Sequence, residues 1–266
     1  MNKKEFMLKI VLIFAALLII IFISDLFWLK QSHPYISGYI CNIITEFIGI
    51  IITVYFIQNI FDKFSAKEKR LEEYNKIIRY NKFISEVIKQ YILYFNCVVQ
   101  PIETRDVKTT FPKEFCIKDL CDLHKTSLLI VAPYMKSSIE IFYKQERSLR
   151  QLFIKLSDSV DFNYYPKLNE IIMKFIRISI QNDDIFSVLI NNEKIMQSDG
   201  TKMIKIFEGM LCGDNIEQLY SDFKQNKLNA NGIMPYFMLY DLLKEEQKII
   251  EEYQTELGKI STEIGK

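Results

Sequence analysis

Four polar or small residues recur along an apolar segment that runs from Tyr39 to Ile60: Asn42, Glu46, Gly49 and Thr53. Their spacing of i, i+4, i+7 and i+11 places all of them on one side of a helix. A carboxylate inside a membrane span costs about 3 kcal/mol on insertion scales and seldom contacts lipid. We call these four residues the polar face, and we expect it to contact protein or water.

The polar face has three interpretations. It can pack against the other span of a hairpin, with Glu46 protonated or hydrogen-bonded there and Gly49 allowing a close helix approach. It can instead mediate self-association and line a central pore. A proton or ion relay of the transporter type is the third interpretation, but two spans are too few for a transporter unless the protein oligomerises.

A second chemical group lies between Ser137 and Asp158 on one predicted helix: Lys144, Arg147, Arg150 and Lys155. We call these residues the basic strip, because the phosphates of a nucleotide or an oligonucleotide ligand could bind along it. Glu140 and Glu146 dilute its charge, and a solvated face with local ion pairs is the alternative. The net charge of +1, from 34 basic and 33 acidic residues, argues against a globally basic nucleic-acid binder.

Signatures of catalysis are missing from the sequence, which has no GxxxxGK(S/T), GxGxxG, HExxH or GxSxG motif. The spacing Cys116-x4-Cys121-x2-His124 matches no common zinc motif, even with Cys97 as a fourth ligand. A Cys–His nucleophilic pair would need an orienting group. We predict no enzyme activity, catalytic residue, metal or cofactor. We interpret Cys97, Cys116, Cys121 and Cys212 as buried thiols that stay reduced in the cytosol.

Two segments are apolar and long enough to cross a membrane, over residues 8–30 and 39–60. A cleaved signal peptide is the alternative for the first segment, but no small-residue cleavage site follows it. Trp28 stands where an interfacial aromatic residue belongs. The short stretch Gln31–Gly38 is expected to connect the two spans in a tight helical hairpin.

Basic residues flank this hairpin on one side: Lys3, Lys4, Lys9, Lys63, Lys67, Lys69 and Arg70. The positive-inside rule therefore predicts a multi-pass protein of the cell inner membrane with both termini in the cytoplasm. The basic residues after the second span can also contact anionic lipid headgroups, so membrane lipid is an expected partner.

Residues 61–100 predict a connecting helix, because no Gly or Pro intervenes between Gly49 and Pro101. Its apolar positions recur near helical spacing: Leu71, Ile78, Ile84, Ile88, Tyr91 and Phe95. If this helix continues the second span, it links the membrane segment to the rest of the chain.

Residues 101–266 predict a helical cytoplasmic domain, so the fold class is all-α with an N-terminal two-helix transmembrane hairpin. The expected helices are Ile117–Val131, Ser137–Ser157, Pro166–Gln181, Ile185–Asn191, Lys202–Leu211, Ile216–Lys224 and Met234–Ile264. Strand patterns are nearly absent, and Leu128–Val131 is the best short one. The apolar stripe of the last helix can pack in its own domain or against a neighbouring molecule.

A run in the second span resembles a pattern found in uncharacterised bacterial proteins with two membrane spans, and it is carried by Glu46, Phe47, Ile48, Gly49, Ile50, Thr53, Val54 and Ile57. Gln58 replaces the acidic residue that is usual in that pattern. A membrane hairpin with a helical cytosolic domain looks like the membrane effectors of bacterial anti-phage defence, of which the Hailong channel effector is one type. The resemblance implies a membrane-disrupting or ion-conducting oligomer that its soluble domain holds closed.

These observations lead to one functional hypothesis and its alternatives. The protein is expected to be an oligomeric membrane effector, an ion channel or pore, whose helical domain senses a ligand or partner. A non-conducting, membrane-anchored sensor or scaffold is the alternative from another class. A membrane-tethered enzyme with an unfamiliar helical site is the third reading, and the missing motifs argue against it.

Overall fold

The structure is a computed structural model that describes residues 19, 20, 23, 34–105, 108–126, 136–228 and 232–264. Within these residues every regular element is a helix, and strand-like pairing is limited to the isolated bridges Thr126–Ser137 and Met196–Lys202. The all-α prediction is therefore confirmed for this part of the chain. Most of the predicted first span (residues 8–30), Trp28 and the strand pattern Leu128–Val131 lie outside the described residues.

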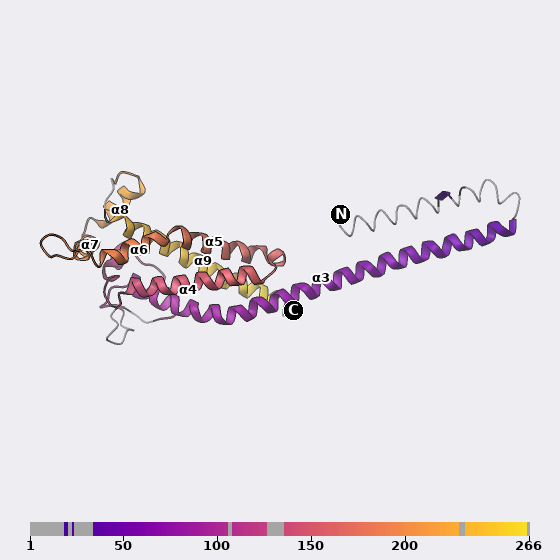
Figure 1. Cartoon of the computed structure of the whole chain (residues 1–266), viewed down its shortest axis with the longest axis horizontal. Coiled ribbons are helices and arrows are strands. Elements are labelled where there is room, and N and C mark those ends of the chain that lie inside the picture. Colours follow the sequence, from indigo (N-terminus) through magenta and orange to yellow (C-terminus); the bar gives the residue numbers. More distant parts are fainter. Residues whose placement is uncertain are drawn as a thin grey trace. The chain divides into compact units, whose positions relative to one another are not determined.

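The helices follow one another along the chain as labelled in Figure 1. In chain order they are α3 (Pro34–Val99), η2 (Ile117–Asp122), α4 (Ser138–Ser159), η3 (Phe162–Tyr164), α5 (Pro166–Gln181), α6 (Asp183–Asn192), α7 (Met203–Leu211), α8 (Ile216–Lys224) and α9 (Met234–Ile264). The elements η2 and η3 are short 3-10 helices.

Most helix bounds agree with the sequence signals. α5, α8 and α9 begin and end at the predicted residues, while α6 and α7 differ from prediction by one or two residues. α4 begins after Ser137, whose hydroxyl accepts a hydrogen bond from the Glu140 amide at 3.3 Å. α5 begins at Pro166, because a proline at the first helical position lacks only an amide that would have no partner within the helix.

The predicted helix Ile117–Val131 is confirmed only at its start, as the 3-10 helix Ile117–Asp122, and a turn and an isolated bridge follow. Two carboxylates of this short helix accept hydrogen bonds from backbone amides. Asp119 accepts from the Cys116 amide at 2.7 Å, and Asp122 accepts from the Ile102 amide at 2.7 Å.

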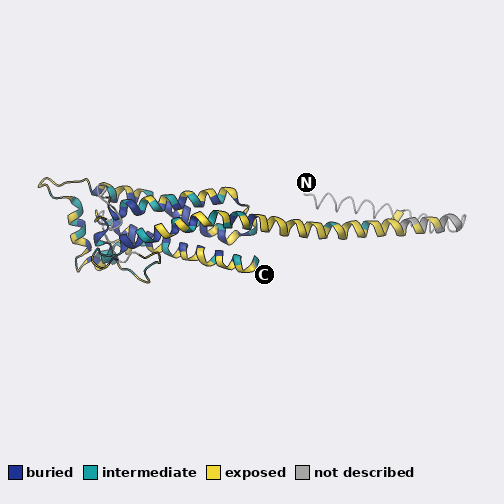
Figure 2. Cartoon of the chain, turned by 90° about the horizontal axis from the view of Figure 1, so that it is seen from below, coloured by how far each residue is buried: buried dark blue, intermediate teal, exposed yellow. Residues whose placement is uncertain are grey.

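The chain divides after Arg70 into two compact units. The described part of the first unit is α3 from Pro34 to Arg70, whose described side chains are nearly all exposed (Figure 2). By length and composition α3 contains a candidate membrane span, and none of its most apolar stretch is buried. Exposed Phe47, Ile52 and Phe56 would be unfavourable in water, so lipid or protein must cover this surface.

The second unit, residues 71–266, is a helix bundle in which α4, α5 and α9 lie alongside the later part of α3, and α6, α7 and α8 gather at one end (Figure 1). The buried stripe of α3 has heptad spacing and consists of Ile77, Ile84, Ile88, Tyr91, Phe95 and Val98. Two of the apolar positions that recur near helical spacing lie outside this stripe. Leu71 is 47% exposed and Ile78 is half-buried, because neither matches the register that Ile77 sets.

Hydrogen bonds between side chains fix the register of α3 against α9. Tyr74 donates to Ser261 at 3.1 Å, Tyr253 donates to Asn81 at 3.0 Å, and Tyr91 donates to Glu246 at 2.6 Å. Residue numbers rise on α3 as they fall on α9, so the two helices are antiparallel. α9 thus buries its apolar stripe within its own unit.

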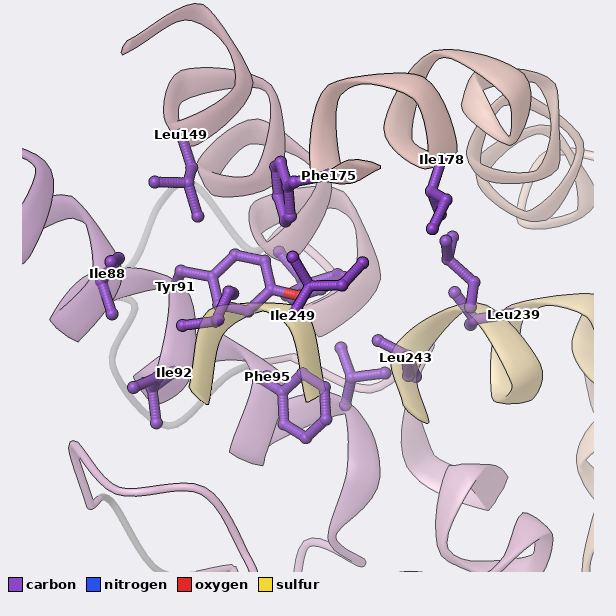
Figure 3. Packing of buried hydrophobic residues seen from close by; sticks show 14 of the residues in the cluster. Ile88, Tyr91, Ile92, Phe95, Leu149, Phe175, Ile178, Leu239, Leu243 and Ile249 are labelled. Carbon is purple, nitrogen blue, oxygen red and sulfur yellow. The ribbon is translucent and has the colours of Figure 1, made fainter. Parts of the chain in front are cut away.

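Aromatic rings fill the centre of the bundle. Figure 3 shows Tyr91 and Phe95 of α3 among apolar side chains from α4, α5 and α9. The Tyr91 ring lies 5.0 Å from that of Phe142, and Phe153 meets Phe175 edge-on at 5.2 Å. Burying each such side chain contributes about 1.5–3 kcal/mol, so α3 is an integral part of this core.

Candidate functional site

The polar face lies on α3 as the sequence predicts, and its four residues are all exposed. The Thr53 hydroxyl donates to the Gly49 carbonyl at 2.8 Å, one turn earlier in the helix. A shallow depression is lined by Glu46, Gly49, Ile50, Thr53 and Val54. Among the described residues, no heavy atom lies within 4 Å of the position that a Cβ at Gly49 would occupy. The face is therefore open to a further helix.

The structure divides the basic strip. Lys144 and Arg147 line an open pocket of about 450 Å³ together with Lys136, Glu140, Tyr143, Ser148, Gln151 and Ile190. We call this hollow the α4–α6 pocket, because six of its lining residues belong to α4 and Ile190 belongs to α6, while Lys136 lies just before α4. Lys136 is a residue that the sequence reasoning missed, since it precedes the predicted helix.

Arg150 and Lys155 do not belong to the α4–α6 pocket. Arg150 is only 9% exposed, and its Nη2 donates to the Asp183 carboxylate at 2.8 Å. Helical geometry explains its position, since six residues turn Arg150 about 120° around the axis from Lys144. Lys155 is exposed, but it lies about 16 Å further along the helix from Lys144. Arg150 and Lys155 therefore do not line the pocket that Lys144 and Arg147 line, and ligand binding by the whole strip stays a prediction.

Tyr143 connects the pocket to the interior. Its ring stacks on Phe186 of α6 at 4.6 Å, and the Arg147 guanidinium lies 5.5 Å from the ring centre. Burial, together with a hydrogen bond to Asp183, raises the pKa of the Tyr143 hydroxyl. Burial opposes ionisation of Asp183, but the hydrogen bonds from Arg150 and Tyr143 outweigh it and lower the pKa of that carboxyl.

Two carboxyl groups are buried in the bundle core, and the sequence analysis did not identify them as a site. Glu146 of α4 and Glu246 of α9 are both 0% exposed. Glu146 accepts a hydrogen bond from Ser179 of α5, and Glu246 accepts one from Tyr91 of α3. One oxygen of each carboxyl group, Glu146 Oε2 and Glu246 Oε1, has no hydrogen-bond partner among the described residues.

Burial controls the protonation of this pair. Desolvation raises the pKa of Glu146 to about 7, against the opposing effect of the Ser179 hydrogen bond. Desolvation, with the negative charge of Glu146, raises the pKa of Glu246 well above its ordinary value. A sequence signal for Glu246 did exist, because it falls in the apolar stripe between Leu243 and Ile249, where a solvated glutamate does not belong.

The cysteines and His124 do not form a metal site in the described residues, where no cluster of three or more ligating side chains occurs. His124 is buried, and its nitrogens are hydrogen-bonded to Glu193 at 2.9 Å and to the Tyr236 hydroxyl at 2.8 Å. The prediction of buried thiols holds for Cys97 alone. Cys121 is half-buried, and the helix ends that carry Cys116 and Cys212 leave both exposed.

No protein-family model, curated protein or solved structure matches this chain. Two features of the described residues bear on function: an exposed polar face on α3, and a basic pocket in the separate helical unit.

Proposed function

We propose that this protein is an oligomeric membrane effector that changes membrane permeability when its helical unit binds a ligand or partner. In this proposal residues 1–60 form a two-span hairpin in a bacterial inner membrane, with both termini in the cytoplasm. Copies of the polar face surround an ion path. The similarity of the architecture, a membrane hairpin with a helical cytosolic domain, to the membrane effectors of anti-phage defence supports a role against phage.

One observation carries the proposal, namely that Asn42, Glu46, Gly49 and Thr53 are exposed on one face of a mostly apolar stretch of α3. Lipid would be a poor neighbour for the Glu46 carboxyl group, and Gly49 has room for an approaching backbone. A further helix, from the first span or from another copy, satisfies both demands.

In an oligomer the Glu46 side chains from several copies form a ring around the central path. Rings of carboxylates favour cations, because they replace part of the hydration that a cation loses in a pore. Asn42 and Thr53 add polar groups one or two turns away on the same face. The expected activity is therefore a cation-preferring conductance.

A non-conducting membrane-anchored sensor is the second candidate. It is favoured by the Thr53 hydroxyl, which is already paired with the Gly49 carbonyl and needs no water. In that case the polar face only packs the hairpin, and Glu46 stays in a dry contact between spans.

Ion flux into proteoliposomes tests these two functions, and membrane depolarisation in cells that overproduce the protein gives a second measurement. We expect the wild type to conduct cations and Glu46→Gln to lose most of its cation preference while keeping its oligomer size. Glu46→Asp is the matched control, since it keeps the charge and should keep the preference. An assembled wild-type oligomer without flux in either assay under activating conditions would favour the anchored sensor.

A further inference from the structure

The α4–α6 pocket carries an excess of positive charge. Lys136, Lys144 and Arg147 face one carboxylate, Glu140, which is ion-paired with Lys136. No carboxylate among the described residues forms an ion pair with Lys144 or Arg147, although neighbouring helices carry many acidic residues. A surplus of two positive charges thus remains in one concave surface.

Arg147 is held in place before any ligand arrives. Its guanidinium lies over the Tyr143 ring, which stacks from behind on the Phe186 ring. A guanidinium that is already oriented loses little side-chain entropy on binding, and its planar donors match two oxygens of a phosphate. Lys144 precedes it by three residues on the same helix face and adds a second cation.

We propose that the α4–α6 pocket binds a small phosphate-bearing anion, with the phosphate held between Arg147 and Lys144. This proposal rests on the proposed function in one respect, since it identifies the ligand that the effector senses. The volume of about 450 Å³ is that of a small-molecule site, and Gln151 supplies an amide for a polar group beside the phosphate.

A long nucleic acid fits the surface less well than a small ligand does. A polyanion needs a continuous basic track, whereas Arg150 is turned inward to Asp183 and Lys155 lies outside the pocket. The exposed cations of the neighbouring groove between α5 and α9 are interleaved with carboxylates, as in the Lys167–Glu256 pair. The excess of positive charge is therefore confined to the α4–α6 pocket and does not extend into the groove between α5 and α9.

Titration calorimetry of the full-length protein in a neutral detergent, with pyrophosphate as the probe, tests the site. We expect saturable binding that weakens as NaCl is raised, because charge pairing drives it. Lys144→Ala and Arg147→Ala should each weaken binding by about tenfold or more, and Arg147→Lys should fall between Arg147→Ala and wild type.

Lys155→Ala is the matched control, because it removes an exposed lysine of the same helix and lowers the net charge equally. It should leave the affinity unchanged within about twofold. Equal losses for Lys155→Ala and Arg147→Ala would show nonspecific charge attraction and overturn the proposal. So would absence of pyrophosphate binding at about 10 mM, or binding of a single-stranded oligonucleotide alone.

Failure of the pocket and failure of the effector are distinguishable. Binding in detergent requires no conduction. A wild type that binds pyrophosphate but shows no ion flux would therefore support the pocket proposal and contradict the effector proposal. A wild type that conducts ions but does not bind pyrophosphate would support the effector proposal and contradict the pocket proposal.

Discussion

Glu46 on α3 and Glu246 on α9 both interrupt apolar stretches of helix, and the two carboxyl groups differ in burial and in hydrogen bonding. Glu246 is fully buried and accepts a hydrogen bond from Tyr91 on a neighbouring helix. Glu46 is exposed, and the described part of the chain contains no hydrogen bond or ion pair to it. The bundle therefore supplies a partner for Glu246, whereas the partner of Glu46 must be lipid headgroup, water or another helix.

The two helices differ in the distribution of the residues around the glutamate. α9 has an apolar stripe opposite charged residues such as Lys248 and Glu252, which is typical of a helix packed in a soluble bundle. Apart from Gly49 and Thr53 of the polar face, α3 carries apolar or aromatic residues on every side between Phe47 and Ile57, which is typical of a helix surrounded by lipid or protein. The same residue type is thus buried with a hydrogen-bond partner in one region and exposed in the other.

Truncation tests the boundary between the two regions and should have the largest effect. A fragment of residues 71–264 should be strongly helical by circular dichroism and melt cooperatively. A fragment of residues 101–264 lacks the α3 stripe, a loss on the order of 10 kcal/mol, because each large buried side chain contributes about 1.5–3 kcal/mol. It should not melt cooperatively. Equal melts for both fragments would show that α3 is dispensable to the core.

Substituting each glutamate by alanine compares the two positions directly. Glu246→Ala leaves the Tyr91 hydroxyl unpaired and creates a cavity, so it should lower the free energy of unfolding of residues 71–266 by about 3 kcal/mol. Glu46→Ala should leave that unfolding unchanged. The measurement is thermal unfolding of the full-length protein in detergent, and a destabilisation of the same size by both variants would contradict the comparison.

The pH dependence of stability follows from the buried carboxyl of Glu146. Its pKa is raised from 4.5 to about 7 on folding, so the folded state binds this proton more tightly than the unfolded state. Stability should therefore fall by about 2 kcal/mol as pH rises from about 5 to about 7.5. Glu146→Gln should flatten this slope in denaturant titrations. Identical slopes for wild type and Glu146→Gln would exclude a raised pKa at Glu146.

Bulk at Gly49 tests whether the exposed face receives another helix. Gly49→Leu should weaken helix association by about 1–2 kcal/mol and shift the oligomer to smaller species, because the side chain prevents close backbone approach. Ile52→Leu, on an exposed apolar position outside the polar face, is the control and should assemble normally. Oligomer size in mild detergent, measured by light scattering, distinguishes them.

The smallest expected effect is at the hydroxyl of Tyr253. Tyr253→Phe removes its hydrogen bond to Asn81 but keeps the buried ring against Phe153. The free energy of unfolding should fall by about 1 kcal/mol, which is the usual net contribution of one such bond. A loss as large as that of Glu246→Ala would mean that all α3–α9 hydrogen bonds contribute equally, whether or not they join a buried carboxyl.

Local signals were enough to predict most of the helices and the polar face. Pro166 and the Asn- and Gly-containing turns mark helix ends through their own backbone preferences, and the four residues of the polar face share one helix. The inward turn of Arg150 and the Glu146–Glu246 pair were not predicted. They depend on contacts with Asp183, Ser179 and Tyr91, which come from other helices and leave no local signature.

The three hydroxyl contacts between α3 and α9 are spaced along the helices, so they restrict sliding. A displacement of α3 by one turn, about 5.4 Å, would break the Tyr74–Ser261, Tyr253–Asn81 and Tyr91–Glu246 bonds together. Partial displacements would lose the bonds without restoring the heptad packing. The three bonds therefore hold the helix pair in one register, and sliding of α3 along α9 would have to break all of them together.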